Sequence, residues 1–222
     1  IEVEGGRIED GSIIWEAKDS ADLSFLDIGQ IGKVEFWVNT LEEIKIDDLE
    51  NKNPTIKNTV TIGETRQDFL TRIESNIGIT QKFYTDNKYF ENSGPYPLQT
   101  GQRTYLTIEW SATSTFNDIN NARIITALPE SITFENKTYS NDEMEIIYNE
   151  ETSEVICNVG TIPAGSGTIK EPKICAFQVS IQPELADEVI ILLGAAQLSG
   201  IDQWTGKTLT AKTDILYAQM SF

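Results

Sequence analysis

Residues 154–179 read EVICNVGTIPAGSGTIKEPKICAFQV, with two runs of alternating apolar residues on either side of a glycine-rich turn. Residues 12–38, SIIWEAKDSADLSFLDIGQIGKVEFWV, repeat this arrangement near the start of the chain. When the two copies are aligned, Trp15 falls on Cys157 and Val34 falls on Cys175. A duplicated pair of alternating strands predicts tandem β-modules, which are more often spacers or binding surfaces than enzymes.

The same period-two alternation recurs through the rest of the chain, for example at residues 105–110 (YLTIEW). Turn signals rich in glycine, proline and asparagine separate these runs, which is typical of short strands. Residues 64–75 could also form a helix face through Phe69 and Leu70, but the neighbouring threonines favour a strand. The predicted fold class is all-β, as tandem Ig-like β-sandwiches.

The boundary between the two modules is predicted at residues 76–78. A long run of further strands precedes the second copy of the pattern, whereas the first copy stands near the very start of the sequence. Residues 1–76 are therefore expected to be the later strands of an Ig-like module that is incomplete at its N-terminus. Residues 77–222 are expected to be a complete module. Half a sandwich leaves an open sheet edge, which either upstream sequence or a strand from another subunit would complete.

The composition excludes several classes of function. The 17 Lys and Arg residues face 35 Asp and Glu residues, and the resulting net charge of −18 disfavours nucleic acid and anionic membrane surfaces as partners. Because the sequence has no histidine, nucleophilic catalysis of the Ser-His-Asp or Cys-His type cannot occur within this chain. We therefore expect no enzyme activity, no cofactor and no metal site.

The apolar runs are short. The longest, residues 189–196 (VIILLGAA), has the length of a strand and not the ~20 residues of a membrane helix. The sequence begins with Ile1, and residues 1–4 already alternate like a strand. We expect a mature or excised piece with no membrane insertion within this chain, and with any signal peptide or anchor outside it.

Cys157 and Cys175 are the only cysteines. The alignment of the two copies places them where Trp15 and Val34 should be inward-facing neighbours on nearby strands. The cysteine pair therefore predicts a disulfide that joins either adjacent strands or the two sheets. A bridge that closes a loop of this size would constrain the unfolded chain by about 3 kcal/mol, and it implies an oxidising compartment.

Other candidate sites carry weaker signals. The acidic runs at 42–43, 47–50 and 141–143 could bind calcium, but none has EF-hand spacing, and solvated loops are the simpler interpretation. Lys82 would be the candidate for a Lys–Asn isopeptide bond if it lay in an apolar pocket beside a carboxylate. Residues 136–138 (NKT) fit the N-glycosylation sequon, which is relevant only in a eukaryotic protein.

Four aromatic residues could form a carbohydrate-binding platform. The alternative is that they cover strand ends and module junctions, which is the commoner use of such side chains. The four are Tyr89, Phe90, Tyr96 and Trp204.

Several motifs resemble repeat domains of bacterial surface proteins, namely the Ig-like modules of the DUF11 type, found notably in candidate-phyla bacteria. The motifs lie at residues 92–102 (NSGPYPLQTGQ), 107–110 (TIEW), 127–129 (ALP), 158–165 (NVGTIPAG), 177–179 (FQV) and 198–206 (LSGIDQWTG). The resemblance covers residues 77–222 well, and residues 1–76 as the tail of a preceding copy. It implies a secreted stalk, adhesin or envelope component without catalytic residues. The two cysteines depart from the apolar residues that are usual at their positions.

The sequence thus predicts a non-enzymatic structural or adhesive module at the bacterial cell surface. Its expected partners are neighbouring modules, copies of the same protein, or a ligand on a host or neighbouring cell. Two alternatives remain open. One is a subunit of an extracellular filament completed by donor-strand exchange, and the other is a carbohydrate-binding module in which Tyr96 and Trp204 contact the sugar.

Overall fold

The computed structural model describes residues 2–18, 23–39, 48–184 and 189–221. The chain divides into two compact units, Ile1–Ile44 and Lys45–Phe222. The predicted all-β class is confirmed, since the regular structure of the described residues consists of strands, with one turn of 3-10 helix at η2 (Leu49–Asn51). No helix in these residues is long and apolar enough to cross a membrane.

The first unit contains two short ladders. β1 (Glu2–Val3) pairs with β4 (Phe36–Trp37), and β2 (Arg7–Glu9) pairs with β3 (Ser12–Ile14). Asp10 and Gly11 join β2 to β3, and both have positive φ, as the tight turn of a two-residue hairpin requires.

The expected equivalence of Trp15 and Val34 to the cysteine pair is not found in this unit. Val34 lies outside the strands and is 40% exposed, and Phe36 in β4 is 43% exposed. Trp15 packs against Phe36, with ring centroids 5.9 Å apart. The prediction that Val34 faces inward is therefore wrong. Alternation assigns side chains to the two faces of a strand, but burial also needs a second sheet, which the two-stranded ladders described here do not supply.

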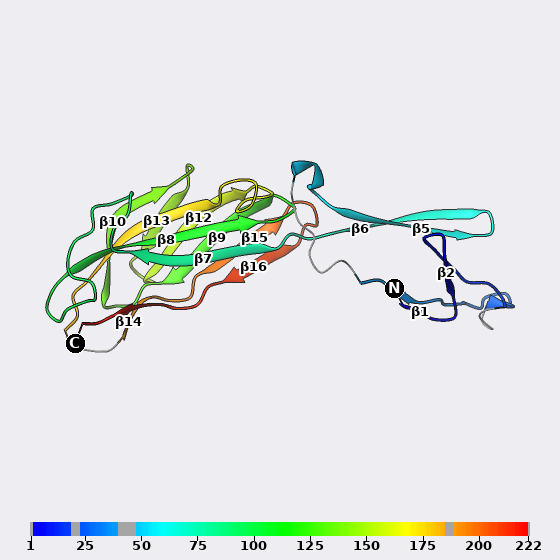
Figure 1. Ribbon diagram of the computed structural model, residues 1–222, viewed down its shortest axis with the longest axis horizontal. Helices are drawn as coiled ribbons and strands as arrows, with labels where there is room; N and C mark the ends of the chain where they lie inside the picture. The colour runs from blue at the N-terminus through cyan, green and yellow to red at the C-terminus, as the bar shows by residue number, and fades with distance from the viewer. Residues whose placement is uncertain (1, 19–22, 40–47, 185–188, 222) are drawn as a thin grey trace. The chain divides into compact units, whose positions relative to one another are not determined.

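The second unit contains an Ig-like sandwich of two antiparallel sheets (Figure 1). The four-stranded sheet has the order β10 (Ile132–Ser140), β13 (Lys173–Ile181), β8 (Thr104–Ser114) and β7 (Ile77–Tyr84). The five-stranded sheet has the order β11 (Glu145–Asn149), β12 (Glu154–Ile162), β9 (Ile119–Ala127), β15 (Gln197–Asp202) and β16 (Thr208–Lys212). Neighbours in the sheets are often distant in sequence, so the chain crosses repeatedly between the two layers.

The core lies between the sheets, where the alternating apolar residues meet. Leu106, Ile108 and Trp110 of β8 are fully buried, as is Phe177 of β13. The rings of Trp110 and Phe177 pack edge to face, 4.9 Å apart, which is a favoured aromatic geometry. The Trp110 indole N–H donates to Gln81 Oε1 at 2.8 Å, so its polar atom is satisfied.

The outer face of the four-stranded sheet is also covered, by the segment between β7 and β8. Tyr105 N–H donates to the carbonyl of Ser93, and the Gln178 amide donates to the carbonyl of Glu91 and to Asn92 Oδ1. This cover explains why Gln178 is buried although it faces away from the core.

A short ladder extends one end of the sandwich. β14 (Val189–Leu193) pairs with β17 (Leu216–Gln219), and β14 leads into β15 through Gly194, whose N–H donates to the carbonyl of Ala127. In the part of the chain that the structure describes, β14 pairs with no strand other than β17.

The last pair of strands precedes the sandwich. β5 (Thr55–Ile62) and β6 (Thr65–Arg72) form a hairpin, which confirms the strand expected at residues 64–75. Sequence analysis grouped residues up to 76 with the first module. The sandwich does begin at Ile77, but the compact units divide at Ile44 and Lys45, so the hairpin belongs to the second unit.

Candidate functional site

The two cysteines form a disulfide between the sheets. Cys157 lies in β12 and Cys175 lies in β13, with Cα atoms 6.6 Å apart. Both are fully buried in the core. Of the two geometries that the sequence left open, the structure has the one that joins the two sheets.

The residues Lys82, Asn136 and Asp142, which the sequence singled out, are all exposed. Lys82 is exposed on β7 and lies outside any apolar pocket. Asp142 pairs with Lys173, and no group of three metal-ligating side chains occurs in the described ranges. The acidic run at 42–43 and the start of the run at 47–50 lie outside the described residues. Asn136 of the sequon has a φ of 56° and lies in an irregular part of β10.

Three of the four aromatic candidates belong to the cover of the four-stranded sheet. Tyr89 stacks on Tyr139 with ring centroids 4.4 Å apart, and its hydroxyl donates to Glu109 Oε2 at 2.7 Å. Burial and the adjacent Glu109 carboxylate raise the pKa of Tyr89. Phe90 donates its backbone N–H to Asn87 in the same segment, and Tyr96 packs on Phe83. These rings serve packing within the fold.

Trp204 lies at the base of the hairpin. Its indole N–H donates to the carbonyl of Pro54 at 3.1 Å, just before β5 begins. The guanidinium of Arg72, at the end of β6, stands 4.5 Å from the centre of the Trp204 ring and donates to the Trp204 carbonyl at 2.8 Å. The Trp204 ring therefore covers the junction between the hairpin and the sandwich. This agrees with the interpretation that the aromatic residues cover strand ends and junctions.

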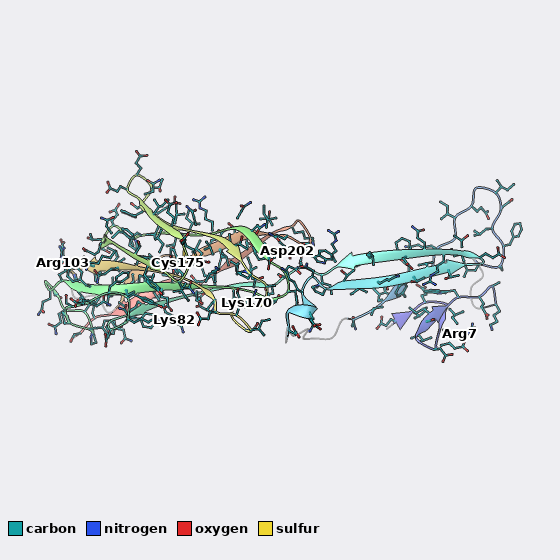
Figure 2. The ribbon with its side chains drawn as sticks, turned by 90° about the horizontal axis from the view of Figure 1, so that it is seen from above. Arg7, Lys82, Arg103, Lys170, Cys175 and Asp202 are labelled. Carbon is teal, nitrogen blue, oxygen red and sulfur yellow. A yellow bond between two sulfur atoms is a disulfide. The ribbon has the colours of Figure 1, made fainter. Side chains whose placement is uncertain are left out.

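A buried carboxylate completes this junction. Asp202 Oδ2 accepts hydrogen bonds from Ser75 N–H and from the Asn117 amide, both at 2.8 Å. Asp202 Oδ1 accepts from the backbone N–H groups of Trp204 and Thr205. Burial would raise the pKa of Asp202, but these four hydrogen bonds hold it below its usual range. An ionised carboxylate thus fastens the end of the hairpin to the five-stranded sheet (Figure 2).

Two further contacts hold the other side of the base. Lys52 Nζ forms an ion pair with Asp118 Oδ2 at 2.5 Å, and Asp118 Oδ1 accepts from Ala164 N–H. Asn53 N–H donates to the carbonyl of Phe116 at 3.1 Å. The hairpin is therefore fixed at its base through both of its strands.

The hairpin itself has two different faces. Gly63 begins its two-residue turn with a φ of 58°, which a type II′ turn requires at that position. Directly paired residues share a face. One face, here called the uncharged face, carries Ile56, Asn58, Val60, Ile62, Thr65, Gln67, Phe69 and Thr71. The opposite, charged face carries Thr55, Lys57, Thr59, Thr61, Arg66, Asp68, Leu70 and Arg72.

All residues of both hairpin strands are exposed. Ile62 is the most exposed apolar residue of the uncharged face, at 76%. An isolated two-stranded hairpin is marginally stable in water, whereas complete burial of a Val, Ile or Phe side chain contributes about 1.5–3 kcal/mol. The uncharged face is therefore a candidate interaction surface.

A second candidate surface lies beside β14. A groove of about 840 Å³ runs along this strand, and its lining includes Arg103, Glu130, Thr133, Ile181, Glu184 and Ile190. Val189 and Ile191 of β14 are 53% and 44% exposed. Ile191 pairs directly with Tyr217, which is also exposed.

Sequence analysis missed both surfaces and the Asp202 network. A signal for the uncharged face was present, because the charged residues within β5 and β6 all fall on one side of the alternation. No comparable signal identifies Asp202, because its partners Ser75 and Asn117 are distant in sequence.

No family model and no curated protein matches the chain. Among solved structures, it is similar to the major pilin subunit BcpA of Bacillus cereus, with 9% identity and a TM-score of 0.41 over 73% of this chain and 51% of BcpA. It is similar to the major pilin SpaD of Corynebacterium diphtheriae, with 10% identity and a TM-score of 0.40 over 64% of this chain and 35% of SpaD. A cohesin module of a Clostridium perfringens glycoside hydrolase shows 15% identity and a TM-score of 0.33, over 66% of this chain and 95% of the module.

The chain spans about half the length of BcpA and about a third of SpaD. At these identities the similarity concerns the fold alone.

Proposed function

We propose that the chain is a non-enzymatic structural module of an extracellular bacterial surface protein, with the sandwich as its rigid unit. The single observation that carries this proposal is the disulfide between Cys157 and Cys175. Structural disulfides persist in oxidising environments and are rare in the cytosol. The position of this one, between the two sheets, suits a module that must keep its layers together outside the cell.

The rest of the second unit is consistent with this role. Among its buried polar groups, the Asp202 carboxylate binds the Asn117 amide and backbone N–H groups at the base of the hairpin. Their geometry fastens two parts of the fold together.

The proposal is tested by finding the protein on intact cells of the organism that encodes it. Brief protease treatment of intact cells should release peptides from residues 77–222, in which Cys157 and Cys175 remain linked. An abundant cytoplasmic protein from the same cells serves as the control and should yield no peptides before lysis. Recovery of the chain only after lysis, or with two free thiols, would overturn the proposal.

A second candidate function is a filament subunit completed by strand exchange between copies. It is favoured by one observation, the hairpin β5–β6, whose uncharged face and two outer edges are exposed. Exposed strand edges are templates for pairing with another chain. Concentration-dependent oligomers that form ladders on gels would support this function, and a monomer at all concentrations in sedimentation would exclude it.

A further inference from the structure

We propose that the hairpin β5–β6 of one copy docks into the groove beside β14 of a second copy, so that copies of the chain join head to tail. The proposal rests on the second candidate function, and it names the donor surface, the acceptor surface and the partner.

The acceptor is the free edge of β14. This strand pairs with β17 on one side, and the described residues provide no strand on its other side. The exposed side chains of Val189 and Ile191 offer apolar surface next to this edge. A strand that added to β14 would therefore gain both backbone hydrogen bonds and apolar contact.

The donor matches this surface in polarity. The uncharged face of the hairpin presents Val60, Ile62 and Phe69, all exposed and without a charged neighbour on the same face. When a hairpin strand pairs with β14, the side chains of that face can lie beside Val189 and Ile191 without burying a charge, which would be costly.

The charges of the two surfaces are also complementary. Residues 55–72 carry three cationic side chains and two anionic ones, so the hairpin is net positive in a chain of net charge −18. The groove is lined by Glu130 and Glu184 against one cationic residue, Arg103. Two copies of so acidic a protein repel each other over most of their surfaces, whereas the net positive charge of the hairpin favours its approach to this acidic groove.

The hairpin and the groove lie at opposite ends of the sandwich. Figure 2 shows Arg103, beside the groove, at the far end from Asp202, which holds the base of the hairpin. β8 connects these ends with 11 residues, which span about 37 Å at ~3.4 Å per residue.

Each hairpin strand has 8 residues and spans only about 27 Å. The hairpin is therefore too short to reach the groove of its own chain, and its acceptor must belong to another copy. A contact between two different surfaces is heterologous, so it can extend into an open chain of subunits.

Cross-linking between two variants tests this contact. One protein carries Val60→Cys on the uncharged face, and the other carries Ile191→Cys beside the groove and a mass tag. The native disulfide is fully buried, so the introduced thiols are the accessible ones. Under mild oxidation the mixture should form mixed dimers at least about tenfold faster than a control mixture in which Leu70→Cys, on the charged face, replaces Val60→Cys.

Equal rates for the two mixtures, or dimers formed mainly between two Val60→Cys chains, would overturn the proposal. Sedimentation of the unsubstituted chain separates this failure from that of the filament function. Oligomers without the mixed cross-link would leave a filament built through another surface. A monomer at all concentrations would remove both the contact and the filament, while the location of the protein on cells would still decide the first proposed function.

Discussion

Asp202 is the residue on which the junction between hairpin and sandwich depends most. Its two carboxylate oxygens accept four hydrogen bonds in a fully buried position. Asp202→Asn would turn an amide group toward two of these donors and leave them unsatisfied, which costs about 1–3 kcal/mol. We expect a lower urea midpoint of unfolding, with Asp214→Asn, an exposed position, as the matched control. Equal midpoints for the two variants would contradict this role.

The same carboxylate should make the stability of the second unit dependent on pH. The folded pKa of Asp202 lies below its usual value, as does that of Asp118, whose main favourable partner is Lys52. In such a case the unfolded chain binds more protons, so the stabilisation is present above the unfolded pKa of about 4 and is lost as the pH falls through the folded pKa.

The measurement is the free energy of unfolding between pH 6 and 2.5 in urea. Wild-type protein should lose more stability over the acidic part of this range than the Asp202→Asn variant does. Parallel pH profiles would show that Asp202 does not contribute in this way.

The two cysteines determine a further part of the stability. Replacement of both Cys157 and Cys175 by alanine removes a bridge across 18 residues, and we expect a loss of about 3 kcal/mol or more, because the core also loses volume. Urea unfolding of the variant, compared with wild-type protein under reducing conditions, separates the two contributions. An unchanged midpoint in both experiments would contradict the bridge.

At the scale of elements, the hairpin shows what alternation can and cannot predict. The strand at residues 64–75 was predicted from its threonines, and β6 confirms it. Whether a face of that strand is buried depends on what covers it. The exposed β5 and β6 have an alternation like that of β12, whose inward residues Val155 and Val159 are buried. A second sheet makes the difference, and only the tertiary structure shows it.

A substitution of Trp204 tests whether its contacts anchor the base of the hairpin. Trp204→Ala removes the hydrogen bond to Pro54 and the contact with the Arg72 guanidinium. We expect faster amide hydrogen exchange in residues 54–73, by about fivefold or more for a loss near 1 kcal/mol, with little change in β8 and β9. Tyr96→Ala, in the cover of the other sheet, is the control. Unchanged exchange in the hairpin would contradict the role of Trp204 as its anchor. Trp204 would then again be a candidate for contact with a carbohydrate ligand.

At the scale of the whole molecule, the sequence predicted the all-β class and the disulfide between the two cysteines. These features follow from local alternation and from the count of cysteines. The division at Ile44 and Lys45 was not predicted, because it depends on contacts such as that between Lys52 and Asp118, which are distant in sequence. The prediction that Val34 faces inward was also wrong. The sequence repeats the alternating pattern of the second copy, but the described residues around Val34 include no second sheet that would bury it.

The central claim is that the sandwich is a structural unit whose two sheets are fastened by one disulfide. Stretching of single molecules held at both ends of residues 77–222 tests it most directly. The bridge between Cys157 and Cys175 prevents the segment between them, a separation of 18 residues, from extending under force. The oxidised protein should therefore lengthen by about 60 Å less on unfolding than the reduced protein. Equal lengthening of the oxidised and reduced proteins would contradict the account.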